Sequence, residues 1–158
     1  MNGVIVLITI SLIYTVFSSF KHTQFVVTPY IFVIRFVHIF ALMFNVLYIF
    51  LFDKRYDILY LVYTICLYGH WSFLNNECIL NILEKQHFRT ETTNIYLYIV
   101  FGDYTDFFLM ITGVLSFINL IIVVNRQEYI PMHLKLTFIV ICLIILTLSG
   151  VSKHTQSI

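Results

Sequence analysis

The segment TPYIFVIRFVHIFALMFNVLYIFLF, residues 28–52, decides the fold class, because its only formally charged residue is Arg35. A helix needs about 20 predominantly apolar residues to cross the hydrocarbon core of a bilayer, and this segment is long enough to cross with some tilt. It opens with Thr28 and Pro29, which are residue types favoured at the N-cap and the first turn of a helix. We therefore predict a transmembrane helix over residues 28–52.

The rest of the chain has the same character. Of its 158 residues, 60% are hydrophobic and 11% are charged, whereas soluble domains carry about 25% charged residues. Further apolar segments predict membrane spans over residues 2–20, 58–74, 107–124 and 136–151. We expect an all-α integral membrane protein, a helical bundle of four to five transmembrane helices that forms a single domain over residues 1–158. Arrangements with four and with five spans both stay open, and the segment 58–74 is at the short end of the range for a span.

Residues 95–101 form an apolar tract that is too short to span a membrane. We expect an interfacial or re-entrant piece here, or a buried strand-like loop.

The distribution of Lys and Arg between the predicted loops does not fix the orientation in the membrane. Cytoplasmic loops usually carry an excess of these residues. In the five-span arrangement each side has four of them: Lys54, Arg55, Arg126 and Lys135 on the side of the N-terminus, and Lys21, Lys85, Arg89 and Lys153 on the other.

Two polar residues of the predicted helix over 28–52 are costly in a bilayer. Arg35 and His38 lie on one face of this helix together with Asn45. A charged side chain within the hydrocarbon must reach the interface or pair with an opposite charge. We expect Arg35 to do one of these, and the expected partner is the carboxylate face of the helix that follows residues 58–74, especially Glu77.

The segment LYGHWSFLNNECILNILEKQ, residues 67–86, runs from apolar residues into a polar cluster. Its spacing places four polar residues on one face of a helix that continues out of the membrane, namely His70, Glu77, Asn81 and Glu84. We interpret them, with the two polar residues of the preceding span, as a structural or docking stripe with no catalytic role. This polar stripe consists of Arg35, His38, His70, Glu77, Asn81 and Glu84.

Other functions have weaker support. His38 and His70 could bind haem as a bis-histidine pair, and Glu84 and His87 have the Glu-x-x-His spacing of di-iron proteins, but in one copy only. The chain lacks the common hydrolase, metalloprotease and nucleotide-binding motifs. Its net charge is +1 without a basic run, which gives no footprint for nucleic acid. We therefore expect no catalytic residues, no cofactor or metal and no nucleic-acid partner.

The block HWSFLNNECILNILEKQ, followed by FGDYTDFF, resembles small multi-span membrane proteins of large eukaryotic (nucleocytoplasmic) DNA viruses. The resemblance extends over residues 67–108 and departs from the pattern at Gln86, where a basic residue is commoner. It implies a protein of the virion internal membrane beneath an icosahedral capsid, or of a host membrane during infection. The residues that carry it are His70, Trp71, Asn76, Glu77, Cys78 and Glu84.

Together these features predict a non-enzymatic structural or assembly protein that anchors or scaffolds partner proteins. Its expected partners are the lipid bilayer and other membrane or capsid proteins of a larger assembly. The alternative is an accessory subunit of a mitochondrial respiratory-chain complex in the inner membrane. That alternative rests on the abundance of Phe, Tyr, Ile and Leu, which is also typical of subunits encoded in ciliate mitochondria.

Overall fold

The computed structural model describes residues 3–21, 27–74, 77–90 and 94–155, with side chains described except at Ser72 and over 145–155. The described residues form helices and no strand, which confirms the predicted all-α fold. The helices are α1 (Gly3–Phe20), α2 (Pro29–Leu51), η1 (Lys54–Tyr56), α3 (Asp57–Phe73), α4 (Ile79–Phe88), α5 (Ile95–Phe101), η2 (Gly102–Tyr104), α6 (Thr105–Asn125) and α7 (Met132–Thr155).

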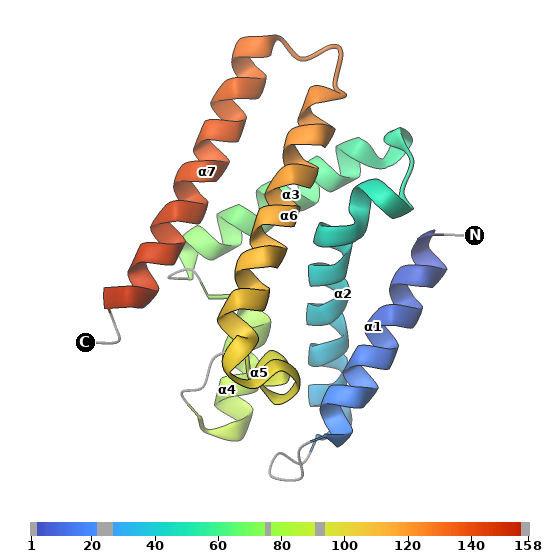
Figure 1. Ribbon diagram of the computed structural model, residues 1–158, viewed down its shortest axis with the longest axis vertical. Helices are drawn as coiled ribbons and strands as arrows, with labels where there is room; N and C mark the ends of the chain where they lie inside the picture. The colour runs from blue at the N-terminus through green and yellow to red at the C-terminus, as the bar shows by residue number, and fades with distance from the viewer. Residues whose placement is uncertain (1–2, 22–26, 75–76, 91–93, 156–158) are drawn as a thin grey trace.

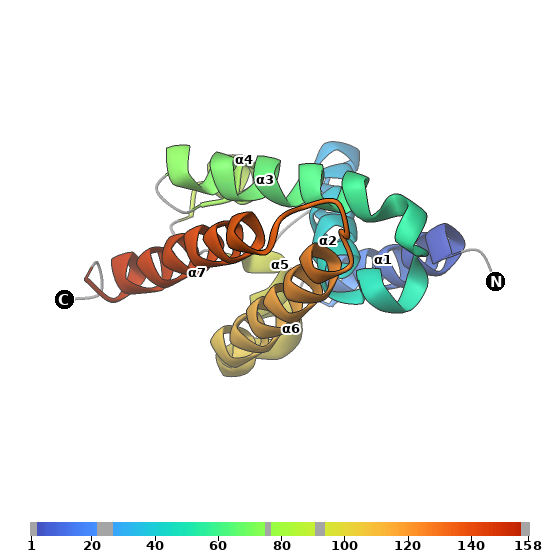
Figure 2. The ribbon, with the colours of Figure 1, turned by 90° about the horizontal axis from the view of Figure 1, so that it is seen from above.

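The long helices form a bundle (Figure 1). α1 and α2 run antiparallel, α6 packs on α2, and α7 contacts both α6 and α3. Viewed from above, α1 and α7 lie at opposite sides of the bundle, with α2 and α6 between them (Figure 2).

Within the described part of the chain, three segments are long and apolar enough to cross a membrane: Gly3–Phe20, Pro29–Leu51 and Ile95–Asn125. The chain is thus suited to a bilayer as a helical bundle. α3 has 17 residues, and the apolar part of α7 whose side chains are described covers Met132–Ile144. Both are shorter than the three segments, so the predicted spans over 58–74 and 136–151 stay predictions.

Small residues let α1 approach α2 closely. The buried face of α1 carries Ser11, Thr15 and Ser18, and a Cβ atom at Gly3 would collide with the carbonyl oxygen of Leu51. Without a hydrophobic driving force inside lipid, close backbone approach and van der Waals contact are the main source of helix association. The spacing of these residues therefore determines which face of α1 meets α2.

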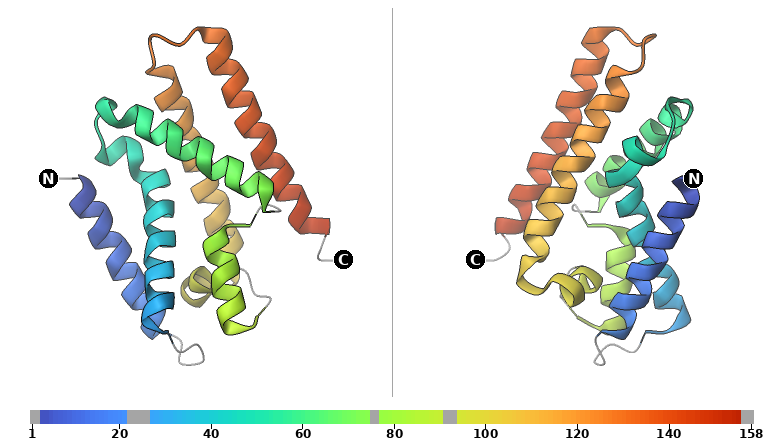
Figure 3. Two further views of the ribbon diagram at one scale, coloured as in Figure 1. Left: turned by 180° about the vertical axis from the view of Figure 1, so that it is seen from behind. Right: turned by 45° about the vertical axis from the view of Figure 1, so that its right-hand side comes forward.

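The predicted continuous helix from the third span into the polar block is wrong. α3 ends at Phe73 and α4 begins at Ile79. The imidazole Nε2 of His70 accepts a hydrogen bond from the backbone N–H of Ile79 at 3.0 Å, in place of a helical carbonyl. This side chain satisfies one of the free N–H groups at the start of α4, which helps to stabilise the break. α3 then crosses the bundle obliquely, while α4 lies beside α2 (Figure 3).

Residues 95–101 form the short helix α5, so the expectation of a strand-like loop is wrong. Ile95, Tyr96, Leu97 and Ile99 are buried in the protein. The chain then turns at Gly102, whose φ of 56° favours glycine. This turn folds α5 back near the start of α6 (Figure 3) and brings Tyr96 into contact with α2.

Candidate functional site: a buried polar junction

The most buried charges in the described part of the chain meet between α2 and α4. Arg35 Nε donates a hydrogen bond to Glu84 Oε1 at 2.6 Å, and the two side chains are 0% and 1% exposed. Arg35 lies six residues after the start of α2, which corresponds to a depth of about 9 Å along the helix axis. The pair therefore joins α4 to the buried face of α2 and does not lie at the surface.

Two further contacts hold the guanidinium group. Arg35 Nη1 donates to the carbonyl oxygen of Ser18 at 3.3 Å, and the Arg35 Cζ atom lies 5.7 Å from the centre of the Phe88 ring. Ser18 belongs to α1 and Phe88 to the end of α4. One cation thus connects α1, α2 and α4.

This geometry decides between the two alternatives expected for Arg35. The side chain does not snorkel, because it is fully buried. Its partner belongs to the expected carboxylate face, but within that face it is Glu84 and not the favoured Glu77. Glu77 instead accepts from Lys85 Nζ at 3.2 Å, in a partly exposed ion pair.

His38 lies at the contact between α2 and α5. Its Nε2 atom is 3.1 Å from the hydroxyl oxygen of Tyr96, and the two ring centres are 4.7 Å apart. Tyr96 is also linked to α1, because the hydroxyl of Tyr14 donates to its carbonyl oxygen at 3.4 Å. His38 therefore takes part in packing α5 between α1 and α2.

Asn81 connects α4 to the start of α5. Its Oδ1 atom accepts a hydrogen bond at 2.7 Å from the backbone N–H of Asn94. Asn94 has a φ of 50°, which is uncommon for a residue other than glycine. The buried amide of Asn81 thus holds the strained residue from which α5 begins.

The polar stripe is consequently divided by the helix break. Arg35, His38, Asn81 and Glu84 all take part in one junction, which we call the polar junction, formed by α1, α2, α4 and α5. His70 stabilises the break between α3 and α4, and Glu77 forms its own ion pair beside it. Asn76, one of the residues that carry the resemblance, lies outside the described residues.

Sequence reasoning missed Tyr96 as a member of the junction. It lies in the tract IYLYIVF, residues 95–101, which has no charged or amide side chain at helical spacing from Tyr96. The sequence therefore indicated no polar face to which Tyr96 could be assigned. The only available signal was the presence of a hydroxyl group in a segment too short to span, because a buried tyrosine hydroxyl usually has a hydrogen-bond partner.

A second buried network at the opposite end of α2 was also missed. Asp57, at the start of α3, accepts hydrogen bonds from the Tyr48 hydroxyl at 3.0 Å and from Gln127 Nε2 at 3.2 Å. Arg126 lies 3.9 Å from the same carboxylate. Asp57 is 2% exposed, so this network ties α3 to the ends of α2 and α6.

Asn45, which shares a predicted face with Arg35 and His38, belongs to a third polar contact in the middle of α2. Its Oδ1 accepts from the Tyr60 hydroxyl at 3.0 Å, and its carbonyl oxygen accepts from Asn119 Nδ2 at 2.7 Å. These bonds connect α2 with α3 and α6. Buried polar contacts therefore recur along α2 from Arg35 to Tyr48.

The polar junction combines a buried ion pair, Arg35 with Glu84, and a contact between an imidazole and a hydroxyl group, His38 with Tyr96. The two histidines of the haem hypothesis use their Nε2 atoms for different protein groups, His38 for Tyr96 and His70 for Ile79. Among the described residues, no group of three or more His, Cys, Asp and Glu side chains could hold a metal ion. What the contacts do is hold helices together.

Comparison of the chain with known protein families, with curated proteins and with solved structures found no match.

Proposed function

We propose that this chain is a non-enzymatic membrane scaffold, which anchors partner proteins of a larger assembly to a bilayer. The observation that carries this proposal is the pairing of Arg35 with Glu84. The two charges neutralise each other, and their contacts join α1, α2 and α4, a role that suits a rigid anchor.

The outer surface of the bundle supports the same role. Large apolar side chains are exposed along the outer faces of α1, α6 and α7, for example Ile13, Val114 and Ile141. Such surface is stable in contact with lipid or with other membrane helices. The protein is therefore built to be embedded, with its polar groups directed inward.

The turn between α5 and α6 offers contacts outside the bilayer. Asp103 and Asp106 are exposed, and Tyr104 between them is 73% exposed. Tyrosine is enriched both in protein–protein interfaces and at the level of the lipid headgroups. We propose that partner proteins bind here.

The setting that we propose is the internal membrane of a large DNA virus, on the basis of the resemblance of residues 67–108. Purified virions should release the chain together with their membrane fraction after detergent treatment, as measured by quantitative proteomics. The complementary measurement is native electrophoresis of mitochondrial membranes. Co-migration with a respiratory complex, and absence from virions, would replace this proposal with that of an accessory subunit.

The scaffold role itself can be tested independently of the setting. Cross-linking in intact membranes, followed by mass spectrometry, should give adducts between the α5–α6 turn and other proteins. Asp103→Ala with Asp106→Ala should reduce these adducts, whereas the exposed Lys54→Ala at the opposite end of the bundle should not. A chain that yields adducts with no other protein would contradict a scaffold.

A further inference from the structure

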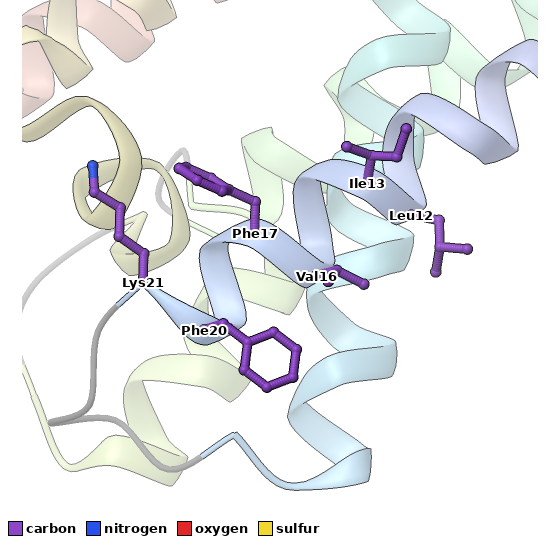
Figure 4. Close-up of a pocket in the computed structure, with 6 residues that line it drawn as sticks. All are labelled: Leu12, Ile13, Val16, Phe17, Phe20 and Lys21. Atoms are coloured by element: carbon purple, nitrogen blue, oxygen red, sulfur yellow. The ribbon is translucent and has the colours of Figure 1, made fainter.

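The outer face of α1 has a shallow apolar groove that ends at a cation (Figure 4). The groove runs along the second half of the helix and is lined by Leu12, Ile13, Val16, Phe17, Phe20 and Lys21. Apart from the Lys21 amine, the lining is made of hydrocarbon side chains. The groove is on the side of α1 that faces away from α2, so the bundle itself does not fill it.

The length of the groove matches half of a bilayer. From Leu12 to Lys21 the helix rises by about 14 Å, and one leaflet contributes about 15 Å to the hydrocarbon core. α1 is one of the candidate membrane spans and ends at Phe20. Lys21 therefore lies where the hydrocarbon of that leaflet meets the headgroups.

The Lys21 amine is held in a fixed position. Its Nζ atom donates a hydrogen bond to the carbonyl oxygen of Val100 at 3.0 Å and lies 5.8 Å from the centre of the Phe17 ring. A lysine ammonium group has three N–H donors, and within the described residues only one of them forms a hydrogen bond. The side chain is exposed, which allows a headgroup to reach it.

We infer that this groove is a binding site for one anionic phospholipid, with an acyl chain along Leu12–Phe20 and the phosphate group at Lys21. The apolar walls fit the chain, and the positive charge at the interfacial end complements the negative headgroup. A zwitterionic lipid with the same chains would gain the apolar contact but less from the charge. The proposed site does not depend on the scaffold role.

Native mass spectrometry of the full chain in detergent tests the preference for charge. The probes are phosphatidylglycerol and phosphatidylcholine with identical acyl chains. One lysine near an anionic lipid surface corresponds to about fivefold in binding, and this is the expected ratio of the first bound lipid. Equal binding of the two lipids by the unaltered chain would overturn the proposal.

Variants then assign the preference to this position. Lys21→Gln should abolish the preference for phosphatidylglycerol, Lys21→Arg should retain it, and Lys54→Gln, which alters an exposed lysine at the other end of the bundle, should leave it unchanged. A preference that survives in Lys21→Gln, or that is lost equally in Lys54→Gln, would contradict the site.

The position of the acyl chain is tested without altering Lys21. Phosphatidylglycerol with a photoreactive group in its acyl chain should label residues 12–20 of the unaltered protein, and Val16→Trp should reduce this labelling by filling the groove. Excess inorganic phosphate should not compete, because the acyl chain provides much of the contact. Labelling confined to other helices, or displacement by free phosphate, would overturn the assignment.

Discussion

Removal of the Glu84 carboxylate should strongly destabilise the bundle. Glu84→Ala leaves the Arg35 guanidinium buried at 0% exposure, with only the Ser18 carbonyl as a hydrogen-bond acceptor. Loss of one partner from a buried ion pair typically costs about 3–5 kcal/mol, because the remaining charge is uncompensated. We expect a decrease of this size in the free energy of unfolding.

The pair also predicts how a double substitution behaves. Arg35→Met combined with Glu84→Leu replaces the two charges by apolar groups of similar length. Such replacements of buried pairs are often neutral or stabilising. The double variant should therefore regain most of the stability that Glu84→Ala loses, and Glu84→Gln should fall between them because its amide oxygen can still accept from Arg35.

The assay is reversible unfolding of the purified chain in mixed micelles, followed by circular dichroism as the fraction of denaturing detergent increases. Glu77→Ala is the matched control, because it removes a glutamate close to the start of α4 whose ion pair with Lys85 is partly exposed. Partly exposed pairs contribute about 0–1 kcal/mol. If Glu84→Ala cost no more than Glu77→Ala, the Arg35–Glu84 pair would not stabilise the bundle as argued here.

Three further substitutions test the remaining contacts. Tyr96→Phe removes the hydroxyl beside His38 Nε2 and should lower the free energy of unfolding by about 1 kcal/mol. The NMR chemical shifts of the His38 ring nitrogens should change as well, and unchanged shifts would exclude the contact. Asn81→Ala leaves the backbone N–H of Asn94 without its acceptor and should cost about 1–3 kcal/mol, with faster amide hydrogen exchange at the start of α5 than in α2. Asp57→Ala removes the acceptor for the Tyr48 hydroxyl and for Gln127 Nε2, so the amide hydrogens of α3 should exchange faster while those of α4 do not. Equal acceleration in both helices would show that the Asp57 network and the polar junction are not separate.

The helix break explains which parts of the polar stripe could be predicted. Asn81 and Glu84 lie three residues apart within α4, and both are buried on one face, as their spacing indicated. His70 lies in α3, before the break, and Glu77 lies in the break between α3 and α4. Periodicity relates residues only along a continuous helix, so their predicted alignment with Glu84 could not hold.

The sequence by itself determined that the chain is helical and suited to a membrane, and that Arg35 must either reach the interface or pair with an opposite charge. These features depend on composition and on the cost of a charge in hydrocarbon, which are local properties. Only the tertiary structure decided that Glu84 is that partner and that Tyr96 meets His38. The reason is that the break near His70 and the turn at Gly102 set the positions of α4 and α5 beside α2, and contacts between separate helices depend on these positions.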